Sequence, residues 1–145
     1  MEYHVKMSNK FYAGIGSRET PEHIQSIMTE IATLLERRRY VLRSGGAEGA
    51  DLAFENGISI SHNKEIYRPD YYFIDGSKKY YSKEDLEFAD KMVKEYHPSK
   101  GKMKNIFAYK LHSRNTFQIF GCGRNTSNSS FVICYTPDGA EDKTT

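Results

Sequence analysis

The stretch from residue 10 to residue 51 decides the fold, and it reads KFYAGIGSRETPEHIQSIMTEIATLLERRRYVLRSGGAEGAD. Its first six residues, 10–15, form a short apolar run that predicts a buried strand. A helix is expected next, because Thr20 is a good N-cap and Pro21 suits a first helical position. Apolar residues then recur at helical spacing as far as a run of three arginines, whose charge suits a helix C-terminus. Residues 40–43 predict a second buried strand, so the stretch indicates a strand–helix–strand unit.

The rest of the sequence continues this alternation. We expect a helix from Gly49 to residues 56–57, a strand at 65–67, helices at 82–97 and 110–120, and a strand at 130–136. The segment 71–81 is rich in aromatic residues and lysine, and we interpret it as a loop. Alternating strands and helices are typical of a mainly parallel sheet covered by helices. The sequence therefore predicts one α/β domain over residues 1–145, with a mobile tail from Ala140.

The composition is that of a soluble protein with little net charge. Lys and Arg total 21 and Asp and Glu total 19, so the formal charge of +2 argues against binding nucleic acid by charge alone. The apolar runs are too short for a membrane span or a signal peptide, so we expect a cytoplasmic protein without membrane contact. Cys122 and Cys134 form no CxxC pair, and both are expected to be buried.

Three strand ends carry small or polar residues where a ligand would bind. They are residues 14–18 (GIGSR), 44–49 (SGGAEG) and 136–139 (TPDG). In an open parallel sheet, ligands lie at the carboxyl ends of the strands. Glycine there lets backbone N–H groups approach an anion, and Arg18 adds a positive charge. Two such glycine turns indicate a ligand that carries phosphate.

The usual nucleotide and catalytic motifs are absent from the sequence. The first turn lacks the third glycine of the dinucleotide fingerprint, and GxxxxGK(S/T), GxSxG and HExxH patterns do not occur. The five histidines have no metal-ligand spacing, so no metal site is expected.

Four blocks of the sequence together resemble the SLOG superfamily. They are residues 11–21 (FYAGIGSRETP), 42–51 (LRSGGAEGAD), 113–115 (SRN) and 131–139 (FVICYTPDG). This superfamily unites the DNA-processing protein A of natural transformation with the LOG-type nucleotide hydrolases. The order of the blocks is most similar to the DNA-processing branch and its small stand-alone relatives, many of them in phages. The resemblance spans most of the chain and implies a Rossmann-like three-layer sandwich.

The strand ends and the resemblance together indicate which residues hold the ligand. The two glycine turns would bind a nucleotide or a nucleotide-derived phosphate, beside an Arg-Asn pair and the end of the last strand. The expected binding residues are Gly14, Gly16, Ser17, Arg18, Ser44, Gly45, Gly46, Ala47, Glu48, Gly49, Asp51, Arg114, Asn115, Gln118, Thr136, Pro137 and Asp138. Three of these, Arg114, Asn115 and Gln118, share one side of the expected helix.

Two departures from the family pattern leave catalysis and assembly open. The sequence lacks the Pro-Gly-Gly-x-Gly-Thr-x-x-Glu block that supplies a catalytic acid in LOG-type hydrolases, which leaves Glu48 and Asp51 as candidates. Family members also continue past the last strand with another glycine turn, a helix and a strand, whereas this sequence ends at Thr145. An open sheet edge predicts self-association, most simply as a two-fold dimer. The alternative is a monomer in which the segment 71–81 covers the gap.

Three functions follow from these observations. The first is a binding protein for a nucleotide or nucleotide-derived signal, which a phage protein would sequester. The second is an enzyme that cleaves a nucleoside phosphate at its N-glycosidic bond, with Glu48 or Asp51 as the acid. The third is single-stranded DNA binding, with aromatic stacking platforms at 71–73 and 80–81 and the lysines Lys100, Lys102, Lys104 and Lys110. We favour the first, because no residue stands at the position of the family's catalytic acid.

Overall fold

A six-stranded sheet forms the centre of the protein. The computed structural model describes residues 10–97, 105–123 and 126–137, and the strand order is β5-β4-β3-β2-β1-β6. The strands are β1 (Lys10–Gly14), β2 (Tyr40–Ser44), β3 (Lys64–Tyr67), β4 (Tyr71–Ile74), β5 (Ser77–Tyr80) and β6 (Val132–Ile133). The helices are α1 (Glu22–Arg37), α2 (Ala50–Asn56), α3 (Lys83–Tyr96) and α4 (Ile106–Phe120), with a 3-10 turn at Ser61–Asn63. The expected tail from Ala140 lies outside the described residues.

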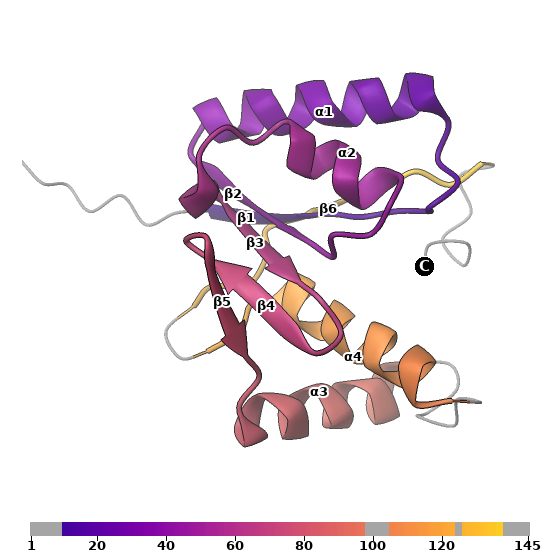
Figure 1. Cartoon of the computed structure of the whole chain (residues 1–145), viewed down its shortest axis with the longest axis vertical. Coiled ribbons are helices and arrows are strands. Elements are labelled where there is room, and N and C mark those ends of the chain that lie inside the picture. Colours follow the sequence, from indigo (N-terminus) through magenta and orange to yellow (C-terminus); the bar gives the residue numbers. More distant parts are fainter. Residues whose placement is uncertain (1–9, 98–104, 124–125, 138–145) are drawn as a thin grey trace, which may run out of the picture.

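The sheet is mainly parallel and has helices on both faces. Strand β1 pairs in parallel with β2 and β6, and β2 pairs in parallel with β3. Helices α1 and α2 cover one face, and α3 and α4 cover the other (Figure 1). The expected α/β class and mainly parallel sheet are therefore confirmed, and the carboxyl ends of β1, β2 and β3 lie together at one end of the sheet.

Helix α2 is fixed to α1 by apolar packing and by two hydroxyl groups. Met28 and Ala32 of α1 belong to the same buried cluster as Phe54 of α2. Thr29 donates from Oγ1 to the carbonyl of Ala53 at 2.7 Å, and Thr33 donates to the carbonyl of Gly57 at 3.0 Å. These bonds hold the middle and the C-terminal end of the short helix against α1.

The prediction of a loop at 71–81 is wrong, because this segment forms the antiparallel hairpin β4–β5. Its turn has positive φ at Asp75 (55°) and Gly76 (74°). An Asp-Gly pair of this geometry is the usual two-residue turn of a hairpin. The hairpin extends the sheet at the β3 edge and places Tyr80 and Tyr81 next to α3 and α4.

Aromatic side chains join the hairpin to the helices beneath it. Tyr67, Tyr72, Ala89 and Phe117 belong to a second buried cluster.

Helix α3 begins as expected at Ser82: its Oγ accepts from the N–H of Asp85 at 3.0 Å, while the Asp85 carboxylate accepts from the N–H of Ser82 at 2.9 Å.

The last two elements differ in length from the expected ones. Helix α4 starts four residues earlier than expected, at an Asn105 cap whose Oδ1 accepts from the N–H of Ala108. Strand β6 is only two residues long, shorter than the expected 130–136. Cys122 is buried as expected, but the prediction for Cys134 is wrong because that side chain is exposed beyond the end of β6.

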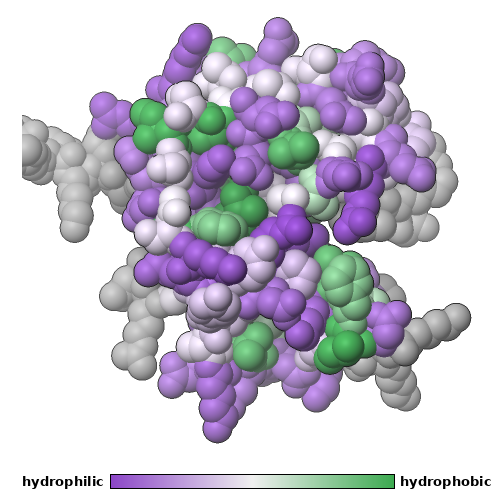
Figure 2. Space-filling view, viewed as in Figure 1, coloured by the Kyte–Doolittle hydropathy of each residue, from purple (hydrophilic) through white to green (hydrophobic). Residues whose placement is uncertain are grey.

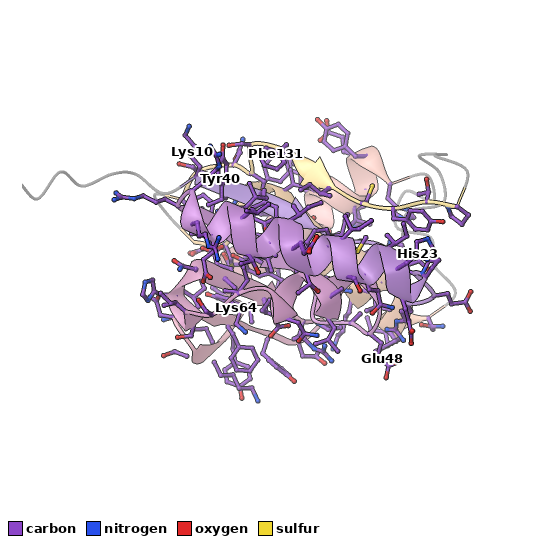
Figure 3. All side chains as sticks on the ribbon, turned by 90° about the horizontal axis from the view of Figure 1, so that it is seen from above. Lys10, His23, Tyr40, Glu48, Lys64 and Phe131 are labelled. Atoms are coloured by element: carbon purple, nitrogen blue, oxygen red, sulfur yellow. The ribbon has the colours of Figure 1, made fainter. Side chains whose placement is uncertain are left out.

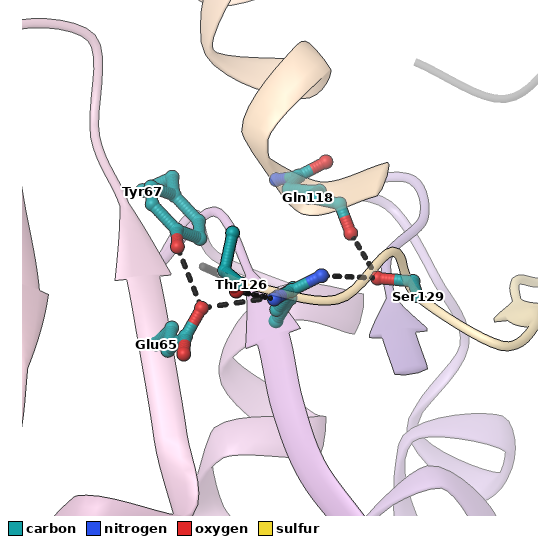
Figure 4. Close-up of polar contacts among 6 residues, drawn as sticks. Glu65, Tyr67, Gln118, Thr126 and Ser129 are labelled. Atoms are coloured by element: carbon teal, nitrogen blue, oxygen red, sulfur yellow. Dashed lines mark hydrogen bonds and ion pairs between the residues drawn. The ribbon is translucent and has the colours of Figure 1, made fainter. Parts of the chain in front are cut away.

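A buried arginine fastens the segment before β6 to the sheet. Arg43 of β2 has no exposed surface, and its Nε lies 3.0 Å from Oε1 of Glu65 (Figure 4). Its other nitrogens donate to the hydroxyls of Thr126 at 2.8 Å and Ser129 at 3.3 Å. Ser129 in turn donates to the backbone carbonyl of Gln118 at 2.5 Å. The network therefore ties α4 and the segment before β6 to the sheet.

Candidate functional site

The candidate site is a cleft where the carboxyl ends of β1, β2 and β3 face α4. We define it as a cavity of about 450 Å³ together with an adjoining hollow of about 210 Å³. In the view of Figure 2, the surface is indented between the part that carries α1 and α2 and the part that carries α4. The cavity is lined by Gly16, Ser17, Arg18, Glu19, Ala47, Asp51, Phe107, Leu111, His112, Arg114 and Asn115. The hollow shares five of these and adds Gly45, Arg68, Pro69, Asp70 and Tyr71.

The two glycine turns pack directly against each other. A Cβ atom on Gly49 would lie 2.5 Å from the carbonyl oxygen of Arg18 and 2.6 Å from that of Ser17. The φ of Gly49 is also positive, at 82°, so only glycine fits both the contact and the backbone conformation. The N–H of Ala50 donates to the Ser17 carbonyl at 3.2 Å. The first turn, which carries Arg18, is thus positioned by the second.

Glycines in the second turn make room for two arginine side chains. A Cβ on Gly45 would lie 2.6 Å from Cζ of Arg114, and a Cβ on Gly46 would lie 2.9 Å from Nη1 of Arg68. Gly46 also has a positive φ of 70°. Arg68 donates from Nη1 to the Gly46 carbonyl at 2.5 Å. The absence of a side chain at Gly45 and Gly46 therefore lets the guanidinium groups approach the backbone.

A buried carboxylate lies between the two turns. Asp51 is 4% exposed, and its Oδ2 accepts from the N–H of Ala47 at 3.3 Å. Burial raises the pKa of the Asp51 carboxyl, although Arg114 and the backbone N–H groups of Ala47, Gly45 and Gly16 oppose this shift. Asp51 thus interacts with N–H groups of both turns, and a bound phosphate has to rely mainly on other donors.

Three arginines supply those donors. Arg114 of α4 donates from Nη1 to the carbonyls of Gly45 at 2.9 Å and Tyr67 at 2.8 Å, which fixes it at the ends of β2 and β3. Arg18 and Arg68 line the same hollow. Burial lowers the pKa of the Arg114 guanidinium; Asp51 and Tyr81 oppose the shift, and the charges of Arg68 and Arg18 add to it. The three cations are therefore close enough to repel one another.

Polar groups of α4 complete the wall of the cleft. The Oδ1 of Asn115 accepts from Nε of Arg114 at 3.0 Å, so the Arg-Asn pair acts as one unit. The rings of His112 and His97 are 4.3 Å apart. Burial lowers the pKa of His112, with further contributions from His97 and Arg114. At neutral pH the His112 imidazole is therefore uncharged and offers a hydrogen bond rather than a positive charge.

Eight of the residues expected from the sequence line the cleft. They are Gly16, Ser17, Arg18, Gly45, Ala47, Asp51, Arg114 and Asn115. Gly49 supports the cleft from behind, and Gly46 lines a different cavity on the far side of Arg68.

The structure does not bring the other expected residues into the cleft lining. Gly14 and Ser44 are in the core, where the Ser44 hydroxyl donates to the Gly14 carbonyl at 2.5 Å. Gln118 is 2% exposed at the other end of α4. Glu48 is exposed at the periphery, near the end of α1 that carries His23 (Figure 3). Thr136 and Pro137 are not among the lining residues either, and Asp138 lies outside the described residues.

Sequence reasoning missed Arg68 and the apolar part of the α4 wall, Phe107 and Leu111. A usable signal existed for Arg68, which directly follows β3 just as Arg18 follows the first glycine turn. Phe107 lies before the expected start of the helix at residue 110, so its position on a helix face could not be inferred. Lys100, Lys102 and Lys104 of the DNA-binding alternative lie outside the described residues.

Neither a metal site nor a membrane span is found in the part of the chain that the structure describes. There, no group of three or more His, Cys, Asp or Glu side chains is placed to hold a metal ion. In the same part, every helix is too short or too polar to cross a membrane.

Comparisons of the chain with protein-family models, with curated proteins and with solved structures found no match. The described part of the chain is of the α/β class, with a six-stranded, mainly parallel sheet, four α-helices and a cationic cleft at the ends of three neighbouring strands.

Proposed function

We propose that this protein binds a nucleotide or a nucleotide-derived phosphate in the cleft. The observation that carries the proposal is the convergence of Arg18, Arg68 and Arg114 on one hollow. Holding three like charges together costs free energy that a bound anion recovers, and guanidinium groups match phosphate oxygens in geometry.

The carboxylates of the cleft leave part of this positive charge uncompensated. Asp51 interacts with Arg114, and Asp70 is paired with Lys110 at 2.5 Å. Among the described residues, neither Arg18 nor Arg68 forms an ion pair. Arg18 is also exposed, so it can reach a ligand without leaving a buried partner. Glu19 also lines the cavity and offsets part of the charge of Arg18 and Arg68, so these facts favour an anionic ligand.

The fold supports the same proposal. A cleft at the carboxyl ends of parallel strands is where ligands bind in doubly wound α/β proteins. We therefore propose a Rossmann-like sandwich of the SLOG superfamily, as the sequence blocks suggest. No residue of the cleft stands at the position of the family's catalytic acid, so we propose that the protein binds the nucleotide without converting it. Its role in the cytoplasm would then include sequestration of a signal nucleotide.

A thermal-shift experiment tests the proposal. Inorganic pyrophosphate, ribonucleoside mono- and diphosphates and the phosphate-free nucleoside adenosine are each added to the protein at low salt. We expect the phosphate compounds to raise the melting temperature and adenosine not to, because a ligand that binds only the folded state stabilises it. An equal shift with adenosine, or none with any phosphate compound, contradicts the proposal.

One observation favours the N-glycosidase as a second candidate. Asp51 is a carboxyl in the cleft lining whose pKa is raised by burial, and a raised pKa is a property that a general acid needs. Glu48 has no such environment, since it is exposed and outside the cleft lining. Chromatographic detection of free base from a nucleoside monophosphate, lost in Asp51→Asn, would support this candidate over binding alone.

Single-stranded DNA binding has weaker support. Lys110 is paired with Asp70, and the Lys78 amine lies 4.1 Å from the ring centre of Tyr71. Both contacts reduce the charge and ring surface offered to a strand. Fluorescence anisotropy with a labelled oligonucleotide tests it, because backbone contacts must weaken as salt is raised.

We also propose a two-fold dimer. The β5 edge carries Lys78 and Lys79 on a strand whose four residues are all exposed, which discourages pairing. At the β6 edge, by contrast, Phe131 and Val132 are apolar and are 37% and 44% exposed. Light scattering over a range of concentrations should report twice the mass of the chain, and a monomer at every concentration would refute the dimer.

A further inference from the structure

A second cavity of about 430 Å³ lies beside the cleft, between α3, α4 and the end of β5. We call it the aromatic pocket, and its walls include Tyr80, Tyr81, Tyr109, Phe117, Leu86 and Ile106. The rings of Tyr81 and Phe117 are stacked, with centres 4.8 Å apart. A cavity of this size with aromatic walls and a few polar groups is typical of a site for a small organic molecule.

The aromatic pocket and the cleft adjoin each other at Arg114. At 3.6 residues per turn, Ile106, Tyr109 and Phe117 lie on one face of α4 and line the aromatic pocket, whereas Phe107 and Leu111 lie on the neighbouring face and line the cleft. Arg114 lies between the two faces and lines both cavities and the hollow that adjoins them. A ligand that contacts Arg114 in the cleft therefore lies beside the aromatic pocket.

The polar groups of the pocket come from α4 and from the residues between β3 and β4. Ser113 lines the pocket, and its side chain interacts with the hydroxyl of Tyr109, which donates to Asp90. Asp70 and Lys110 offer one acceptor and one donor more in the pocket lining.

We propose that the aromatic pocket binds the base of the ligand whose phosphate lies in the cleft. The ligand class is then a nucleoside phosphate, bound across Arg114 with its base among tyrosine rings and its phosphate near Arg18 and Arg68. This inference rests on the proposed function, and it adds the requirement for a base. A planar heteroaromatic ring fits such walls because stacking on aromatic side chains is favourable for every base.

Isothermal titration calorimetry with matched probes tests the inference. The probes are the four ribonucleoside 5′-monophosphates and ribose 5-phosphate, which carries the same phosphate on a sugar without a base. Because base–aromatic stacking is favourable, we expect at least one nucleotide to bind with an affinity about five- to 150-fold higher than that of ribose 5-phosphate.

Two variants change the pocket without touching the core. Tyr80→Ala removes a ring that is 70% exposed, and Leu86→Asp puts a charge on a side chain that is 51% exposed. Their controls are Tyr96→Ala (71% exposed, on α3) and Leu34→Asp (55% exposed, on α1), neither of which lines the pocket or the cleft.

Each outcome decides the question. We expect the pocket variants to bring the nucleotide affinity down toward that of ribose 5-phosphate, whose own affinity stays constant, while the control variants change neither. The proposed base site is overturned if both pocket variants bind nucleotides as tightly as the unmodified protein does. It is also overturned if the unmodified protein binds all five probes with equal affinity. Either result leaves the proposed phosphate site unaffected. Absence of binding by every probe contradicts the proposed function itself, and the base site is then rejected with it.

Discussion

Replacing Arg114 by methionine removes the residue that holds the cleft together, and its cost follows from the contacts. Nη1 makes charge-assisted hydrogen bonds to the carbonyls of Gly45 and Tyr67 at 2.9 and 2.8 Å. At about 1.5 kcal/mol each, their loss lowers the free energy of unfolding by about 3 kcal/mol. Arg114 also opposes the rise in the pKa of the buried Asp51 carboxyl, so its removal takes a favourable electrostatic interaction away from Asp51.

The pH dependence of this loss separates the electrostatic contribution from packing. Burial raises the pKa of Asp51 in the folded protein, so Asp51 disfavours folding increasingly as pH rises above the ordinary carboxyl value. Arg114 opposes that shift, and in Arg114→Met the pKa of Asp51 should rise further. The variant should therefore lose more stability at pH 7.5 than at pH 4.5.

Urea denaturation followed by circular dichroism at the two pH values measures the effect, and Arg37→Met, an exposed substitution on α1, is the control. Stability equal to that of the unmodified protein at pH 7.5 would refute the contact argument. A loss of the same size at both pH values would refute the role of Asp51.

Two further predictions concern the glycine turns and the cysteines. Gly49→Ala should lower the free energy of unfolding by about 2–4 kcal/mol, because its Cβ would lie 2.5 Å from the Arg18 carbonyl in addition to the strain of a positive φ. Gly123→Ala is the control, because Gly123 has a positive φ of 96° but open space around it, and its free energy of unfolding should fall by only about 1 kcal/mol. Denaturant titrations measure both losses, and equal losses would contradict the close packing of the two turns. Cys134 is exposed and should react with a maleimide before Cys122, whose burial raises its pKa to about 12. Mass spectrometry after partial labelling reads the order, and faster modification of Cys122 would show that the α4–β6 region is packed differently.

Sequence reasoning was most successful where periodicity and capping agreed. The run at residues 10–15 and the helical spacing after Pro21 predicted β1 and α1 closely, and Ser82 marked the start of α3. It failed at 71–81, because aromatic and lysine residues on a half-exposed hairpin lack the clear alternation of a strand. The Asp75-Gly76 pair was the available signal for that hairpin.

The candidate site was predicted in part, and the reason lies in tertiary contacts. Strand ends identified Arg18 and the glycine turns, since topology alone brings such ends together, whereas Asp51 was expected from the resemblance of residues 42–51 to the SLOG superfamily. The contact of Gly45 with Arg114 joins residues 69 positions apart. The sequence pattern indicates a glycine turn but not what fills the space beside it. Only the structure shows that Arg114 and Arg68 fill this space and that Asp51 interacts with N–H groups of both turns.

The most direct test of the central claim is calorimetric titration of a ribonucleoside 5′-diphosphate into the unmodified protein and Arg18→Ala, with Arg37→Ala as a control of equal charge. Arg18 is exposed and lines the cleft, whereas Arg37 is exposed at the end of α1. A charge-assisted hydrogen bond of about 1.5–3 kcal/mol predicts that Arg18→Ala weakens binding about 10- to 150-fold, with Arg37→Ala unchanged. Equal dissociation constants for all three proteins, or the same weakening in both variants, would contradict a phosphate site in the cleft.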